Sequence, residues 1–310
     1  MEKVIITAAL TGAVHIPTQS PYLPFTPEAI AEEAIRCWRA GAAVVHIHAR
    51  DPIEGFPSSD PKLYTTILQR IIHQTDLVVC ITTGGGRGMS FEERTKIISL
   101  FKPEMASFNM GSMNFSIHPL AKRYKTEDYR FEWEKTWMES FRSFTFQNNF
   151  ADLEALCRFM EENEVKPELE IYDVGQLYNT HYLLREGFLK KPLHMQFVTG
   201  ILGGIASTVE DLVHLNNRAN HLFGNDYTWS VIGAGFPAQF RMAAVALGMG
   251  GHVRVGLEDS LKLSKDKLAE SNAQQVEVAV QLTRILGKEP ATPDEARSFL
   301  GLKGKGNVLI

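Results

Sequence analysis

Two histidines separated by a single residue are the strongest chemical signal in this 310-residue sequence. His46 and His48 end a β-branched run, residues 43–48, and polar residues follow them directly. Side chains at positions i and i+2 of a strand point to the same face, so both imidazoles can reach one ion. Imidazole binds Zn²⁺ and related divalent metals well. The pair therefore predicts a divalent metal site, although two hydrogen-bonded core histidines would share this spacing.

A carboxylate that could complete the site follows the last predicted strand. Glu258 and Asp259 come just after this strand, and Arg254 lies within it. Catalytic metal sites typically combine imidazoles with an acidic ligand and keep one position open. We therefore expect Glu258 as the third ligand, Asp259 as a base, and Arg254 as a cation that orients the base or binds an anion. Taken alone, the two acidic residues would better fit a solvated helix N-terminus.

The elements that must hold these residues alternate along the whole chain. Short β-branched runs predict eight strands, at residues 4–9, 43–48, 77–82, 105–110, 169–173, 193–198, 228–232 and 252–255. Stretches with helical period follow them, at residues 27–40, 61–74, 91–100, 152–162, 176–186, 209–216, 237–249 and 273–286. Eight such units predict an α/β fold, a closed (β/α)8 TIM barrel forming a single domain over residues 1–310 with a C-terminal extension. An open doubly wound sheet is the alternative.

Closure of the barrel would bring the candidates together. Catalytic residues of this fold lie where the strands end and the βα loops begin. The second and eighth strands both flank the first, so the histidine pair is expected close to Glu258. This neighbourhood favours metal ligation over the two structural alternatives.

Glycine-rich strand ends could bind an anionic substrate. The third strand ends at Thr82, and the glycine run that follows includes Gly84 and Gly85. Its exposed backbone N–H groups can receive a carboxylate or a phosphate. Residues 199–204 and 233–237 form further small-residue loops at the usual anion-binding positions of the fold, where they suit a nucleotide-bearing cosubstrate or simply a tight turn.

Polar side chains on two central strands could contact a substrate as well. Ser107 and Asn109 share one face of the fourth strand, and Glu168 and Glu170 share one face of the fifth. Buried carboxylates are costly unless they are paired or functional. We therefore expect Ser107, Asn109 and Glu170 at the substrate site.

One stretch, residues 117–149, fits no barrel element. It is rich in aromatic and charged residues and follows the fourth strand. We interpret it as an insertion that forms a flap or a subunit contact, and an extra helix packed on the barrel is the alternative.

Composition and charge exclude several classes of function. Hydrophobic residues make up 44% of the chain and the net charge is −4, so no basic field attracts nucleic acid or anionic membrane. The three cysteines are far apart and lie in apolar contexts, which indicates buried thiols in a reducing compartment. No signal peptide or membrane span is expected, and the predicted location is cytoplasmic.

Taken together, the motifs resemble the β-keto acid cleavage enzyme family over nearly the whole chain. They are the run from Val45 to Asp51, Thr82 to Gly85, Glu168 to Glu170, and Val253 to Asp259. The resemblance implies a Zn²⁺-dependent Claisen-type exchange, in which a β-keto acid and acetyl-CoA give acetoacetate and a new acyl-CoA. Other divalent ions could take the place of zinc. A Lewis acid and a carboxylate base suit the removal of a proton next to a ketone.

Each role implied by the resemblance falls on a residue singled out above. The metal ligands would be His46, His48 and Glu258. Asp259 would be the general base, positioned by Arg254. The keto acid carboxylate would be held by a set of strand-end groups, namely Thr82, Gly84, Gly85, Ser107 and Asn109. Family likeness also implies a homo-oligomer, with a tetramer as the expected state.

The first βα loop departs from the family pattern. Family members that act on an amine-bearing keto acid carry an acidic residue there, whereas this chain has Val14. An apolar side chain cannot pair with an ammonium group. We therefore expect a different β-keto acid as the substrate.

Three other classes of protein share parts of this pattern. Metal-dependent hydrolases of the amidohydrolase type carry the histidine pair on the first strand and use further ligands that are missing here. A zinc-dependent aldolase that acts without CoA would use the same enolate chemistry. A ligand-binding barrel with a structural metal would need a closed, four-ligand site.

Overall fold

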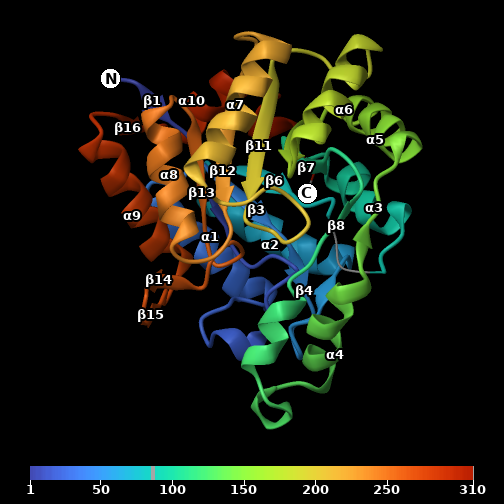
Figure 1. Ribbon diagram of the computed structural model, residues 1–310, viewed down its shortest axis with the longest axis vertical. Coiled ribbons are helices and arrows are strands. Elements are labelled where there is room, and N and C mark those ends of the chain that lie inside the picture. The colour runs from blue at the N-terminus through green and yellow to red at the C-terminus, as the bar shows by residue number, and fades with distance from the viewer. Residues whose placement is uncertain (85–87, 310) are drawn as a thin grey trace.

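Eight parallel strands close into a barrel in this computed structural model, which describes residues 1–84 and 88–309. The barrel strands, in order around the sheet, are β2 (Ile6–Ala9), β3 (Val44–Ile47), β6 (Val78–Ile81), β7 (Met105–Asn109), β10 (Lys166–Ile171), β11 (Leu193–Thr199), β12 (Tyr227–Gly233) and β13 (His252–Val255). The prediction of a (β/α)8 TIM barrel is confirmed, and all eight predicted strands lie in it. Figure 1 shows the strands at the centre of the molecule.

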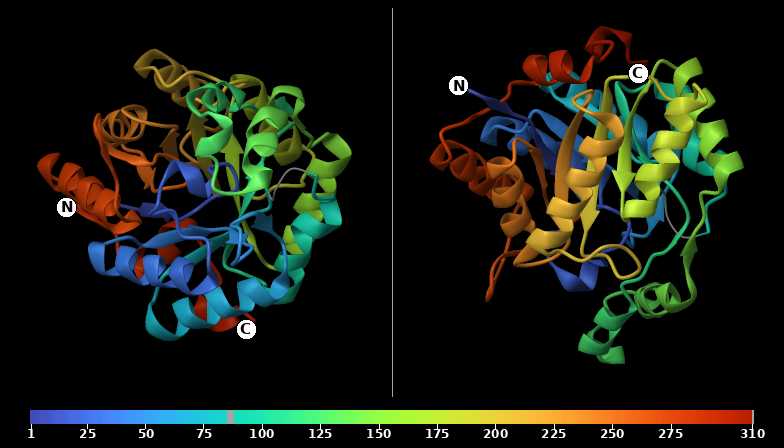
Figure 2. Two further views of the ribbon diagram at one scale, coloured as in Figure 1. Left: turned by 90° about the horizontal axis from the view of Figure 1, so that it is seen from below. Right: turned by 45° about the horizontal axis from the view of Figure 1, so that its top comes forward.

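Helices surround the strands, as the view from below shows (Figure 2, left). They are α1 (Pro27–Ala40), α2 (Pro61–Gln74), α3 (Phe91–Phe101), α5 (Phe150–Glu162), α6 (Val174–Arg185), α7 (Val209–Phe223), α8 (Ala238–Gly248) and α9 (Asn272–Ile285). Thr26 caps α1 and Asp60 caps α2, each before a proline at the first helical position. Helix α7 extends beyond the predicted end at residue 216, because the stretch that follows carries no helix-ending glycine before Gly224.

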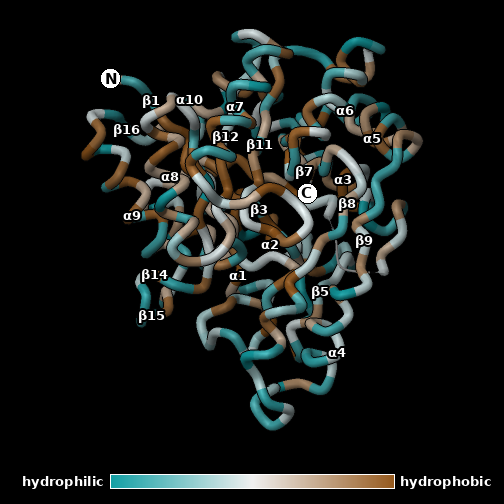
Figure 3. The backbone as a smooth tube through the Cα atoms, viewed as in Figure 1, coloured by the Kyte–Doolittle hydropathy of each residue, from teal (hydrophilic) through white to brown (hydrophobic). Residues whose placement is uncertain are grey.

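The hydrophobic core lies mainly between the strands and these helices. Figure 3 shows that the most apolar segments of the chain run through the middle of the molecule. The barrel interior, by contrast, contains buried polar side chains from several strands. The C-terminal helix α10 (Pro293–Leu300) packs Ala296 and Leu300 against Ile5, Val44 and Val78, at the amino ends of the strands. The C-terminal extension therefore covers the end of the barrel opposite the carboxyl ends of the strands.

Short elements complete the chain. The paired strands are β1 (Lys3–Val4) with β16 (Glu289–Pro290), β4 (Ala49–Arg50) with β5 (Pro57–Ser58), β8 (Met113–Asn114) with β9 (Thr145–Phe146), and β14 (Lys262–Ser264) with β15 (Lys267–Leu268). The 3₁₀ helices are η1 (Pro17–Gln19), η2 (His118–Arg123), η3 (Thr126–Asp128), η4 (Phe141–Ser143) and η5 (Lys305–Asn307). In the described ranges, no helix has the length and apolar character required to cross a membrane.

The stretch at 117–149 forms a small helical lobe with α4 (Glu132–Ser140) at its centre. The lobe projects from the end of the barrel opposite the chain termini (Figure 2, right). Trp137, Met138 and Phe141 pack with Ile16 of the first βα loop. The buried Glu134 carboxylate accepts hydrogen bonds from the backbone N–H of Thr18 at 2.9 Å and from its hydroxyl at 2.6 Å. Apolar packing and hydrogen bonds therefore attach the lobe to the first βα loop.

Candidate active site

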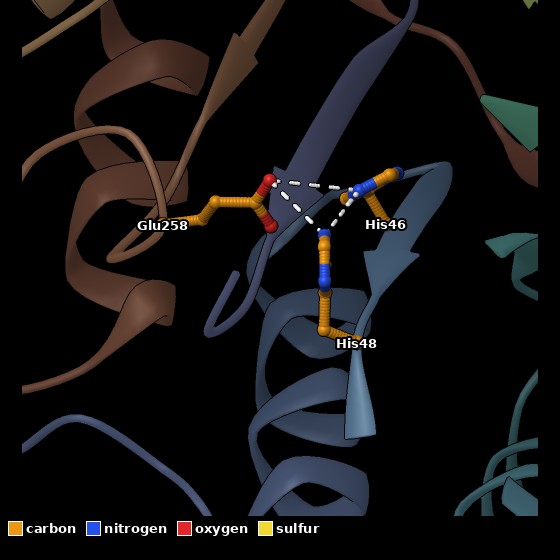
Figure 4. A group of neighbouring side chains, drawn as sticks. All are labelled: His46, His48 and Glu258. Atoms are coloured by element: carbon orange, nitrogen blue, oxygen red, sulfur yellow. Dashed lines mark hydrogen bonds and ion pairs between the residues drawn. The ribbon is translucent and has the colours of Figure 1, made fainter. Parts of the chain in front are cut away.

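Two imidazoles and one carboxylate meet at the carboxyl end of the barrel (Figure 4). His46 lies on β3 and His48 one residue beyond its end, while Glu258 follows β13. The sheet order β13-β2-β3 places both segments beside β2, as closure of the barrel requires. The two Nε2 atoms are 3.2 Å apart, and each lies 3.5 Å from Glu258 Oε1.

The spacing of these three atoms fits a divalent metal. Four ligands at about 2.0–2.1 Å from a tetrahedral Zn²⁺ lie about 3.3–3.4 Å from one another. The separations of 3.2, 3.5 and 3.5 Å are close to that value. Two polar atoms of the cluster, His46 Nδ1 and Glu258 Oε2, are buried with no hydrogen-bond partner in the described part of the chain. The donor set and its geometry therefore suit an ion with one open position.

Electrostatics favour the protonation states that a metal needs. Burial lowers the pKa of His46 to about 3, although the negative charge of Glu258 raises it, so the ring is neutral, which is the form that can bind a metal. Burial disfavours the ionised form of Glu258, but Arg254 and then the two imidazoles hold its pKa well below the usual range. A neutral imidazole and an ionised carboxylate result.

A glycine in the first βα loop makes room for the carboxylate. Gly12 has φ +58°, and a Cβ there would lie 2.5 Å from Glu258 Cγ. Any side chain at this position would therefore displace the Glu258 side chain in addition to straining the backbone.

Arg254 and Asp259 form a buried pair beside the cluster. The guanidinium donates to Asp259 Oδ2 from Nε at 2.9 Å and to Oδ1 from Nη2 at 3.0 Å, and its Nη2 also reaches Glu258 Oε1 at 2.6 Å. Burial raises the pKa of Asp259 to about 6, with Arg254 opposing the shift and Glu258 adding to it. A carboxylate with a raised pKa, fixed by an arginine, is well suited to accept and return a proton near neutral pH.

These groups open onto one cavity of about 1130 Å³. The predicted residues that line it are His46, His48, Thr82, Gly84, Ser107, Asn109, Glu170, Arg254, Glu258 and Asp259. Gly200 and Gly235, from the two late glycine loops, line it as well. Gly85 lies outside the described residues. The structure thus gathers at one site the described residues of the predicted set.

The acidic residues of the fifth barrel strand, β10, and of the segment just after it lie in three different surroundings. Glu170 faces the cavity, and burial raises its pKa to about 8, against Arg254 and with help from Glu168 and Glu258. Glu168 is fully buried and is not among the residues that line the cavity. Asp173 is exposed and caps α6 by accepting from the Gly175 N–H at 3.2 Å.

Several residues that shape the site were not singled out from the sequence. Arg50 is fully buried and donates to the backbone carbonyls of Thr11, Gly12 and His15 in the first βα loop, at 2.8–3.0 Å. Arg50 continues the alternation of His46 and His48, which is the pattern that could have identified it. The lobe adds Trp137 and Phe141 to the cavity wall.

Titratable groups gathered at the carboxyl ends of barrel strands are how (β/α)8 enzymes build their active sites, so fold and cavity together define an enzyme of this class. The chain itself belongs to the beta-keto acid cleavage enzyme family, which residues 3–302 match. The family resemblance predicted from the motifs is therefore confirmed.

Relatives of known activity match the chain over almost its full length. A 3,5-dioxohexanoate:acetyl-CoA acetone transferase of Paraburkholderia graminis is 45% identical over 99% of this chain and 98% of its own. A 3-keto-5-aminohexanoate cleavage enzyme of Fusobacterium nucleatum is 36% identical over 98% of this chain and 99% of its own. Among solved structures, the apo form of ObcA superimposes with a TM-score of 0.74 at 22% identity, over 91% of this chain and 66% of that one, which is a similarity of fold.

Proposed function

We propose that this protein is a zinc-dependent enzyme that exchanges acyl groups between a β-keto acid and acetyl-CoA, giving acetoacetate and a new acyl-CoA. The observation that carries the proposal is the His46, His48 and Glu258 cluster, placed beside the Arg254–Asp259 pair in a chain of this family. Acetyl-CoA is the cosubstrate named for the 45% identical relative. A cavity of about 1130 Å³ has room for both a short keto acid and the acyl end of a thioester.

His46, His48 and Glu258 would hold the zinc ion, which, when bound, supplies Lewis-acid stabilisation of negative charge on a ketone oxygen. Asp259 would remove a proton from C2 of the keto acid, and Arg254 would hold its carboxylate in place. The C2 carbanion then bonds to the acetyl carbon as CoA thiolate leaves. Attack of the thiolate on the original ketone carbon breaks its bond to C2, and Asp259 returns the proton to C2 of the departing acetoacetate.

Substrate carboxylate binding falls to the strand ends that face the cluster. Thr82, Gly84, Ser107 and Asn109 line the same cavity, and we assign them to the keto acid carboxylate, together with Gly85 of the same loop. Glu170 donates or accepts a hydrogen bond depending on its protonation, and its carboxyl already accepts from the Tyr172 hydroxyl at 3.0 Å. We assign Glu170 to substrate binding as well.

The cavity wall around Val14 disfavours a substrate with an ammonium group. Val14 packs with the uncharged lobe residues Ile117, Trp137 and Phe141, and a charged lobe residue that lines the same cavity, Arg123, is itself a cation. An ammonium group would be desolvated there without a carboxylate partner. A second ketone, as in the substrate named for the 45% identical relative, carries no charge and meets a much smaller penalty. We therefore infer a neutral β-keto acid of the 3,5-dioxo type.

Placing a carboxylate in the first βα loop should change this preference. Val14→Glu is expected to raise kcat/KM for 3-keto-5-aminohexanoate roughly 10-fold or more, because a hydrogen bond to a charged group contributes about 1.5–3 kcal/mol. Val14→Gln, a neutral side chain of similar size, is the control and should not produce the gain. Equal kinetics for the two variants on the amino acid substrate would place Val14 outside the reach of the substrate.

A panel assay tests the proposed reaction against its rivals. Purified protein with Zn²⁺ is incubated with β-keto acids, with and without acetyl-CoA, and products are read by mass spectrometry. New acyl-CoA that forms only when both substrates are present supports the exchange. Cleavage without CoA would instead indicate an aldolase, and release of free acid from amide or ester substrates a hydrolase.

Location and assembly complete the proposal. The buried thiols of Cys37, Cys80 and Cys157 agree with a reducing, cytoplasmic compartment. Family likeness supports a homo-oligomer, with a tetramer as the expected state. The lobe at 117–149 is one candidate contact for such an assembly.

A further inference from the structure

A buried polar network lies beneath the candidate metal centre, and the reaction proposed above makes no use of it. Its middle is Glu168 of β10, which is fully buried. Gln196 donates to Glu168 Oε1 at 3.3 Å, and the Cys80 thiol donates to Oε2 at 3.5 Å. His194 Nε2 lies 3.7 Å from Oε1. A carboxylate at this depth is costly unless it is paired and hydrogen-bonded, and these partners meet that need.

The amide of Gln196 connects this carboxylate to the candidate catalytic pair. Gln196 Oε1 accepts from Arg254 Nη1 at 3.1 Å, while its Nε2 donates to Glu168 and to Ser230 Oγ at 3.0 Å. A carboxylate can only accept and a guanidinium can only donate, so these two partners fix which way the amide points. Gln196 therefore fixes the guanidinium of Arg254 through Nη1, while Nε and Nη2 donate to Asp259.

The same carboxylate also lies close to a candidate metal ligand. One ring nitrogen of His46, the Cys80 Sγ and a Glu168 oxygen lie within 4.8 Å of one another. His46 Nε2 faces Glu258 (Figure 4), and its Nδ1 is buried with no partner among the described residues. Metal-bound histidines almost always donate their other N–H to a carboxylate, a carbonyl or a water, and this contact orients the ring and strengthens it as a ligand.

We propose that Glu168 is a positioning residue for the whole centre, which fixes Arg254 through Gln196 and provides the negative charge behind His46. This inference rests on the proposed function, because it requires a metal at the cluster. Gln196 Nε2 and the Cys80 thiol donate to the two oxygens of Glu168, an arrangement that suits an ionised carboxylate, which can only accept. The contact with Gln196 is the one that connects Glu168 to Arg254, since the same amide accepts from Arg254 Nη1 at 3.1 Å.

Zinc affinity is the readout that separates this role from a purely structural one. Glu168→Gln, which keeps the size of the side chain and removes its charge, is expected to weaken Zn²⁺ binding about 10–100-fold in competition with a chromophoric chelator. The visible spectrum of the Co²⁺-loaded variant should shift as well. Glu104→Gln is the matched control, because it removes the charge of another buried carboxylate, which pairs with Arg297 at the amino end of the barrel and has no contact with the network. It should bind Zn²⁺ like the wild type.

A second variant keeps the test decisive if Glu168→Gln does not fold. Gln196→Leu removes the link to Arg254 but spares the contact of Glu168 with His194. It is expected to lower kcat at least about 10-fold, with little change in KM or in zinc content, because Arg254 orients the base rather than the substrate.

The outcomes distinguish this inference from the proposed function. Wild-type protein that binds no divalent metal would overturn both. Wild-type protein that binds Zn²⁺, together with a folded Glu168→Gln variant of equal affinity and unchanged Co²⁺ spectrum, would overturn only the role of Glu168. Unchanged kcat in Gln196→Leu would overturn the link to Arg254.

Discussion

Replacing Asp259 with asparagine is expected to lower kcat by about 10²–10⁴-fold while the protein keeps its zinc. Asparagine has nearly the same shape as aspartate, and its oxygen can still accept from Arg254, but its amide cannot take a proton from carbon. Asp259 points to Arg254 through both oxygens, and it is not part of the His46, His48 and Glu258 cluster. The measurement is steady-state acyl exchange together with zinc content by elemental analysis.

The zinc content of Asp259→Asn shows whether Asp259 is the base or a metal ligand. If Asp259→Asn loses the metal along with its activity, Asp259 is a ligand, and the assignment of Glu258 needs revision. If the variant keeps both metal and turnover, the base is another residue. Glu170, the other buried carboxyl with a raised pKa in the same cavity, would then be the next candidate.

Removal of one imidazole of the cluster should also have a large effect, on both zinc binding and activity. His48→Ala leaves one imidazole and one carboxylate, too few ligands for a catalytic zinc site, so both stoichiometric zinc and exchange activity are expected to be lost. His48 Nε2 lies 3.2 Å from its neighbour in the cluster, and no other described side chain completes the set. Zinc is measured after dialysis against a weak chelator, and activity is measured with and without added Zn²⁺.

A surface histidine provides the matched control for metal content. His73→Ala on helix α2 removes an exposed imidazole and should change neither zinc content nor turnover. Full activity of His48→Ala without bound metal would contradict a metal-dependent reaction.

The barrel and the centre of its site could be predicted from the sequence because both depend on local patterns. Short β-branched runs and helices of period 3.6 identify the eight units, and the topology of a closed barrel then places the segment after β13 beside the end of β3. His46 and Glu258 are 212 positions apart in the chain (258 − 46), yet only the strand order was needed to bring them together.

Other features depend on contacts that no local pattern encodes. The alternation that places Glu168 and Glu170 on one face of β10 does not say which of them reaches the cavity, because this depends on how deep each position lies in the barrel. The bridge made by Gln196 requires side chains from three strands, β10, β11 and β13. The lobe around α4 is held by Glu134 and the first βα loop, a contact across 116 positions of sequence.

Isotope transfer from acetyl-CoA tests the central claim most directly. The zinc-loaded protein is incubated with 3,5-dioxohexanoate and acetyl-CoA carrying ¹³C in both acetyl carbons, and the products are separated by mass spectrometry. The proposed exchange predicts acetoacetate labelled at C3 and C4, together with an unlabelled acetoacetyl-CoA formed from the keto acid. Unlabelled acetoacetate, or label that stays in acetyl-CoA while the keto acid is consumed, would contradict the exchange.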